Sequence, residues 1–215
     1  MGRRSDAKQK LLAAAFEMFW ENSYGSVSVD QICDRAKVRK GSFYYFFRAK
    51  ADIAVAACED HWKVRQSELD RLFSPQVQPL ERLSKWCASV YQAQKDKSEK
   101  YGHVCGCPTA SIGVELATQQ EKIRIKAKEL MSRNIKCLES AIADAKQEGL
   151  VGAENAKAAA QQVYSFVVGA IVQAKIQNDV EVLHHLEPTV MAIIGAKMLV
   201  PAWGPDSVFE GKDPL

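Results

Sequence analysis

The residues best suited to chemistry lie between Ser28 and Lys50, where a basic, hydroxyl-rich stretch has the sequence RKGSFYYFFRAK. Arg39 and Lys40 carry the donors that suit the O6 and N7 atoms of guanine. Gly41 has no Cβ, so the backbone there can approach a partner closely. These residue types, side by side, predict contact with nucleic acid.

Hydroxyl groups follow directly after these cations. Ser42 can bond a base or a phosphate, and Tyr44 and Tyr45 offer donors on an apolar body that suit a phosphate or a thymine methyl group; an interior position is the alternative for Tyr45. Ser28 and Lys50 each open an expected helix, where free backbone amides and the helix dipole attract a phosphate. We therefore expect Ser28 and Lys50 to set the register on the phosphates. The residues expected to recognise sequence are Arg39, Lys40, Ser42 and Tyr44.

Two short helices must position these side chains. A helix is predicted from Ser28, because Ser28 and Gln31 have the spacing of a capping box, and a second one covers about residues 39–46. A first helix, ending at Tyr24-Gly25, precedes them. A helix, a tight turn and a basic second helix are the layout of a helix-turn-helix, whose second helix enters the DNA major groove.

The charge distribution agrees with a polyanionic partner for the N-terminal part. Residues 1–50 hold ten Lys/Arg and five Asp/Glu, a net charge of +5, whereas the remainder has 19 basic and 21 acidic residues, a net charge of −2. Such asymmetry favours a nucleic-acid-binding end. A solvated charged face is the alternative explanation.

The rest of the chain shows helical apolar spacing, so the expected fold class is all-α with about nine helices. Pro188 should kink or split the last helix, because proline lacks the amide donor and clashes with the preceding turn. Residues 201–215 are expected to form an irregular tail. The further helices are expected at residues 50–73, 80–98, from 108, 120–148, 153–177 and 180–199.

The segment AKVRKGSFYYFFRAKADI, residues 36–53, resembles the signature of TetR-family transcriptional regulators. Lys37 and Arg39 depart from the usual glycine and serine. The resemblance implies a helix-turn-helix domain over residues 1–49, an effector-binding and dimerisation domain over residues 50–200, and a repressor released from its operator by a small molecule. The matching positions are Ala36, Val38, Lys40, Gly41, Tyr44, Phe47 and Lys50.

A single helix-turn-helix covers half of a site, so a palindromic double-stranded operator requires a homodimer. The resemblance places the dimer interface on the two C-terminal helices. On the first of them we expect small and apolar residues to be exposed for close helix contact, with an ordinary buried helix as the alternative. These residues are Ala159, Val163, Val167, Ala170 and Ala174.

The resemblance also places an effector pocket between the helices after residue 50. Aromatic side chains suit its walls, although aromatics at helical spacing are more often plain core. The loop HVCGCP, residues 103–108, adds Cys107 as the expected cap of the helix that Pro108 begins, where the helix N-terminus would lower the thiol pKa. The aromatic candidates are Trp62, Trp86, Tyr91, Tyr164 and Phe166.

Several function classes are disfavoured. No apolar run approaches the ~18 residues of a membrane span, no secretory signal is expected, and six cysteines without one indicate reduced thiols in the cytoplasm. We find no motif of an enzyme and expect no cofactor and no metal site, although His103, Cys105 and Cys107 could bind a soft metal. Two alternatives stay open: a repressor that senses oxidants or electrophiles through Cys107, and an architectural DNA-binding protein without an effector.

Overall fold

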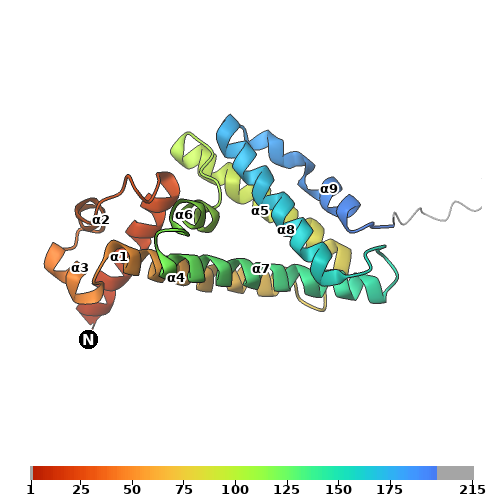
Figure 1. Cartoon of the computed structure of the whole chain (residues 1–215), viewed down its shortest axis with the longest axis horizontal. Helices are drawn as coiled ribbons and strands as arrows, with labels where there is room; N and C mark the ends of the chain where they lie inside the picture. Colours follow the sequence, from red (N-terminus) through yellow and green to blue (C-terminus); the bar gives the residue numbers. More distant parts are fainter. Residues whose placement is uncertain (1, 198–215) are drawn as a thin grey trace, which may run out of the picture.

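The computed structural model describes residues 2–197, and their side chains from Asp6 onward. Within these residues the fold is all-α, as predicted, with nine α-helices, one short 3₁₀ helix and no strand (Figure 1). The expected irregular tail, residues 201–215, lies outside the described part. The helices are α1 (Gly2–Glu21), α2 (Val29–Ala36), α3 (Lys40–Phe46), α4 (Lys50–Leu72), α5 (Pro79–Tyr101), α6 (Pro108–Leu116), α7 (Glu121–Gln147), α8 (Ala156–Gln177), η1 (Val180–His185) and α9 (Leu186–Ile193).

The N-terminal unit consists of α1, α2 and α3, which pack on one another at one end of the molecule (Figure 1). The predicted capping box begins α2: the Ser28 hydroxyl accepts from the Gln31 amide at 3.1 Å, and the Gln31 side chain accepts from the Ser28 amide at 2.7 Å. Fully buried Leu11, Phe19 and Phe43 close the core of this unit. The local sequence therefore sets the start of α2.

The turn between α2 and α3 passes through Lys37 in the left-handed conformation, at φ 54° and ψ 43°. This is the position where the chain has lysine in place of the glycine of the family signature. A side chain with a Cβ is disfavoured at positive φ by roughly 1–2 kcal/mol. The Lys37 amide nevertheless closes the turn, bonding the Asp34 carbonyl at 3.1 Å.

The remaining helices build a bundle in which the long helices α4 and α7 lie side by side, with α5, α8 and α9 packed beyond them (Figure 1). The short helix α6 lies between the N-terminal unit and this bundle and contacts both α1 and α7. No candidate membrane-spanning helix is found among the described residues.

The last expected helix is split, and the split falls before Pro188. Residues 180–185 form the 3₁₀ helix η1, and Pro188 is the third residue of α9. Proline is tolerated there because the first amides of a helix have no intrahelical partner. The α-helix ends at Ile193, short of the predicted end at residue 199, which lies outside the described residues.

The expected exposed face of α8 is wrong. Ala159, Val163, Val167 and Ala174 are buried within the chain, and Ala170 is partly buried, because α8 packs this side against α7. The opposite side of α8 is the one open to solvent. It carries Ser165, Gly169, Val172 and Ile176, with Val172 45% and Ile176 79% exposed.

Candidate nucleic-acid interface and internal cavity

The α3 helix presents most of the predicted contact residues on one open surface. Arg39, Lys40 and Gly41 are exposed at its start, and Tyr44 and Tyr45 are 52% and 67% exposed. Tyr45 is therefore not a core residue. Ser42 is half-buried. Large aromatic side chains left open at the end of a basic helix are typical of a surface that is covered by a partner.

Packing within the chain does not explain the residue type at Gly41 or at Lys40. A Cβ built on Gly41 would meet no atom within 4 Å, so packing within the chain does not require glycine there. The Lys40 ammonium pairs with Asp30 at 2.7 Å, on the solvent side of α2. Exposed pairs of this kind contribute little to stability, so Lys40 can exchange Asp30 for another acceptor.

Ser28 and Lys50 differ from the others, because their side chains have partners inside the N-terminal unit. The Ser28 hydroxyl is held in the capping box of α2. The Lys50 ammonium turns toward the turn between α1 and α2, where it donates to the Tyr24 carbonyl at 2.9 Å and the Val27 carbonyl at 2.8 Å. Burial lowers the pKa of Lys50, and the nearby Glu115 carboxylate opposes that shift.

Glu115 of α6 also holds this turn, a role that the sequence did not indicate. Its two carboxylate oxygens accept from the Tyr24 amide at 3.1 Å and the Gly25 amide at 2.7 Å. The turn between α1 and α2 is thus clamped between a carboxylate from α6 and an ammonium from α4. No local pattern in the sequence relates residues about 90 positions apart.

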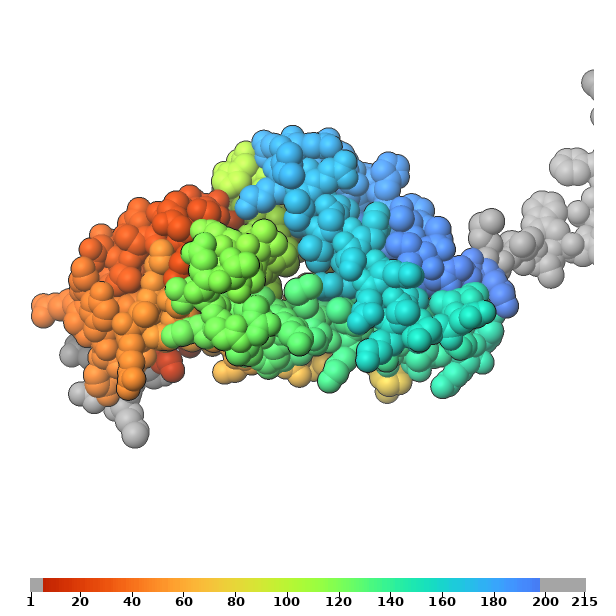
Figure 2. All heavy atoms as spheres, viewed as in Figure 1, coloured from red at the N-terminus to blue at the C-terminus, as the bar shows by residue number. Residues whose placement is uncertain are grey.

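A cavity of about 340 Å³ lies between α4, α5, α6, α7 and α8, with one wall from α1. Figure 2 shows an opening in the surface between α6 and α7 on one side and α8 on the other. The volume falls in the range of small-molecule sites. Four of the predicted pocket residues line the cavity: Trp62, Trp86, Cys107 and Tyr164.

The other two predicted pocket residues do not line it. Tyr91 lies at a separate hollow beside η1, where its hydroxyl donates to Glu181 at 3.3 Å and its ring packs edge-on against His184. Phe166 follows Tyr164 by two residues, which places it on nearly the opposite side of α8. The positions of Tyr91 and Phe166 around their helices thus direct these two side chains away from the cavity.

The wall from α1 consists of Trp20, which sequence reasoning did not select. Its indole N–H donates to the Gly106 carbonyl at 2.6 Å. His61 of α4 lines the cavity beside it and stacks on Phe16 of α1, with ring centroids 4.0 Å apart. Burial, helped by the charges of Arg65 and Lys97, lowers the pKa of His61 to about 4, so this imidazole is neutral near pH 7.

The loop before α6 does not bring together its three candidate metal ligands, His103, Cys105 and Cys107. Cys107 is the N-cap of α6, as predicted, and is partly accessible. Burial raises the pKa of its thiol, and the backbone amides of Thr109 and Ala110 only oppose that shift, so the expected lowering is wrong. Cys105 is buried and His103 bonds the Glu21 carbonyl at 3.1 Å. Between residues 6 and 197 no three His, Cys, Asp or Glu side chains gather as metal ligands.

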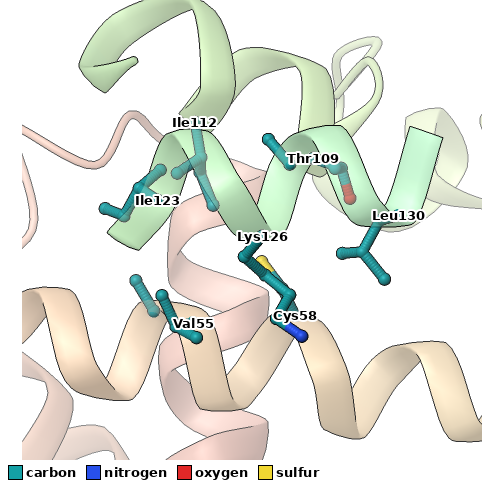
Figure 3. Close-up of a pocket in the computed structure, with 9 residues that line it drawn as sticks. Val55, Cys58, Thr109, Ile112, Ile123, Lys126 and Leu130 are labelled. Carbon is teal, nitrogen blue, oxygen red and sulfur yellow. The ribbon is translucent and has the colours of Figure 1, made fainter. Parts of the chain in front are cut away.

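A second, much smaller cavity of about 10 Å³ adjoins the first in the seam between α4, α6 and α7. Figure 3 shows Val55 and Cys58 of α4 pointing toward Ile112 of α6 and Lys126 of α7. The space holds one water at most. Cys58 lines both cavities, and burial raises its pKa to about 12, so it is a small apolar wall residue.

Comparison with known proteins gives the same picture as the geometry. Residues 11–57 match the model "Bacterial regulatory proteins, tetR family", and residues 79–190 match "Tetracyclin repressor-like, C-terminal domain". The chain is 26% identical over 191 residues to the HTH-type transcriptional repressor NemR of Escherichia coli (strain K12), covering 88% of this chain and 94% of NemR. It is 28% identical over 185 residues to the transcriptional regulator AcuR of Cereibacter sphaeroides, covering 85% and 83%.

Solved structures share the fold over nearly the whole chain. Reduced E. coli NemR superimposes with a TM-score of 0.77 at 24% identity, covering 90% of this chain and all of that one. A regulatory protein TetR from Rhodobacter sphaeroides gives a TM-score of 0.77 at 28% identity, covering 87% and 98%. The arrangement of α1 to α9 is therefore one already seen in solved structures.

Proposed function

The chain belongs to the TetR family of bacterial transcriptional regulators, and from this premise we propose that it is a repressor released from its operator by a small molecule. As a member of that family it is a DNA-binding regulator and not an enzyme. The observation that carries the proposal is the shared wall: Trp20 belongs to α1 of the DNA-binding unit and also lines the cavity. We assign the protein to the cytoplasm, where an operator would be found.

The proposed operator contacts are the exposed residues of α3 and the helix starts beside it. Arg39, Lys40, Ser42 and Tyr44 are assigned to base edges, with Gly41 allowing close approach, and Tyr45 to a phosphate. Ser28 and Lys50 mark the starts of α2 and α4, where the helix dipole attracts a phosphate; the Ser28 amide and hydroxyl and the Lys50 ammonium themselves have internal partners. We assign residues 1–49 to this unit and residues 50–200 to effector binding and dimerisation.

The proposed homodimer presents two α3 helices to the half-sites of a palindromic operator. Its interface would use α9 and the exposed side of α8, where Ser165, Gly169, Val172 and Ile176 share one face. A Cβ at Gly169 would meet open space, so a second helix can approach closely there.

An effector in the cavity would reach the DNA-binding unit by two routes. One is direct contact with Trp20 and with His61, which stacks on Phe16 of α1. The other is α6, whose first residues line the cavity and whose Glu115 holds the turn before α2. A ligand that prefers one position of α6 would shift the position of α2 and α3. The presence of the cavity disfavours an architectural protein with a filled core.

Thiol sensing through Cys107 is the second candidate. The thiol lines the cavity, so a reactive molecule that enters would meet it, and the solved relative NemR is described as a reduced form. The raised pKa of Cys107 opposes this function, because the thiolate is the nucleophile. A small-molecule effector is therefore the better supported proposal.

Operator binding by the purified protein, measured with and without small molecules and mild oxidants, tests both functions. Release by a non-reactive compound that persists in Cys107→Ser is the expected result. Release only by oxidants, reversed by a reductant and absent in Cys107→Ser, would favour thiol sensing. A protein that stays bound to its operator under every condition would refute both.

A further inference from the structure

The cavity is lined by mostly uncharged residues but contains one cation without an acidic partner. Lys97 of α5 is half-buried and lines it, and no carboxylate lies within ion-pair distance of its ammonium among the residues whose side chains are described. The other cation, Arg65, is neutralised by Glu68 at 2.7 Å. The charged groups in the lining are Arg65, Glu68 and Lys97, so the cavity carries a net charge of +1.

Aromatic rings hold the Lys97 ammonium in place. It lies 4.5 Å from the Trp20 ring centroid and 5.6 Å from that of Tyr101. Cation–π contact fixes the position of the charge but does not neutralise it. The low pKa of His61, which the charges of Lys97 and Arg65 reinforce, agrees with a positive potential in this part of the cavity.

The remainder of the cavity suits a flat apolar body. Trp62, Trp86 and Tyr164 are buried and contribute aromatic walls, and Val167 and Ile171 add aliphatic ones. A volume of about 340 Å³ equals on the order of ten water molecules at about 30 Å³ each. A ligand with one aromatic ring and a short substituent therefore fits inside it.

We propose that the cavity takes a small aromatic carboxylate, with its ring between the tryptophans and its negative charge on Lys97. A carboxylate is favoured over a neutral group because it supplies the counter-charge that the protein does not provide. The assignment rests on the effector function proposed above and names the chemical class of the molecule that binds.

The test uses the full-length protein and three matched probe series: benzoate, phenylacetate and cinnamate, their amides, and the corresponding amines. Binding is measured by calorimetry. The wild type should bind the carboxylates at least roughly tenfold more tightly than the amides. Lys97→Met should remove that preference, and Lys97→Glu should transfer it to the amines.

Lys100→Met is the matched control, because Lys100 lies on the same helix but pairs with Glu17 at 3.1 Å, outside the cavity lining. It should keep the wild-type preference. A wild type that binds no carboxylate, or binds it no better than its amide, overturns the proposal, as does an unchanged preference in Lys97→Met. Operator release is measured separately. Carboxylates that bind without releasing DNA would refute the repressor function but support the proposed ligand class. Release by neutral compounds alone would support the repressor function and refute the proposed ligand class.

Discussion

Removing the Lys50 ammonium should destabilise the N-terminal unit more than it changes the attraction to DNA. The ammonium donates to the Tyr24 and Val27 carbonyls and lies 4.1 Å from the Tyr24 ring centroid. Lys50→Met keeps most of the aliphatic length and deletes the charge. Hydrogen bonds from a charged group contribute about 1.5–3 kcal/mol. Because Lys50 is only partly buried, we expect a loss of about 2 kcal/mol in the free energy of unfolding.

Two measurements separate the roles of Lys50. Chemical denaturation followed by circular dichroism gives the change in unfolding free energy. Operator affinity measured over a range of salt concentrations gives the number of phosphate contacts, since each one contributes about 0.9 to the slope of log K against log salt. The slope of folded Lys50→Met should equal that of the wild type.

Lys40→Met is the comparison, because the Lys40 ammonium is exposed and pairs only with Asp30 across the surface. It should leave the unfolding midpoint close to that of the wild type and relax base preference at one operator position. An internal structural role for the Lys50 ammonium is refuted if Lys50→Met unfolds like the wild type and lowers the salt slope by about one. That result would mean that the ammonium leaves the turn to bind a phosphate.

Substitutions at Gly41 and Lys37, and the titration of His61, should each change the stability of the fold. Gly41→Ala should stabilise the fold by up to about 1 kcal/mol, since alanine is the better helix former and the site is open. The same substitution should weaken operator binding in a mobility-shift assay. An unchanged DNA affinity would refute a close approach of the backbone to DNA at Gly41. Lys37→Gly should raise the unfolding free energy by about 1 kcal/mol, because φ is 54°, and a lower melting temperature would contradict this. The pKa of His61 is lowered to about 4 in the folded protein, so between about pH 6.5 and pH 4 only the unfolded chain binds a proton at this residue. The free energy of unfolding should therefore fall as the pH drops through that window, by up to about 3 kcal/mol. His61→Phe should flatten the pH dependence of the melting temperature, and an unchanged pH dependence would exclude His61 as its source.

Features set by neighbouring residues could be predicted from the sequence. The capping box of α2 joins residues three apart, and Cys107 and Pro108 are adjacent at the start of α6. The amphipathic stripes placed the helices to within a few residues in most cases. Such features depend on local geometry, which the sequence displays directly.

Features set by helix rotation and by distant contacts could not be predicted. Tyr91 and Phe166 have the right residue type but the wrong phase for the cavity. The exposed face of α8 was misplaced for the same reason, because small residues suit both close packing on α7 and close packing on a partner. Trp20 lies one turn beyond Phe16, at the border of the apolar stripe of α1; an aromatic residue there was the one available signal.

The proposed domain boundary at residue 49 is crossed by several contacts. Trp20, the stacking of Phe16 on His61 and the bonds from Glu115 to the turn after α1 all cross it. Under the proposed function, a chimera that exchanged residues 1–49 for those of a relative would change the effector response as well as the operator preference. Exchange of this N-terminal segment would therefore not transfer operator preference on its own.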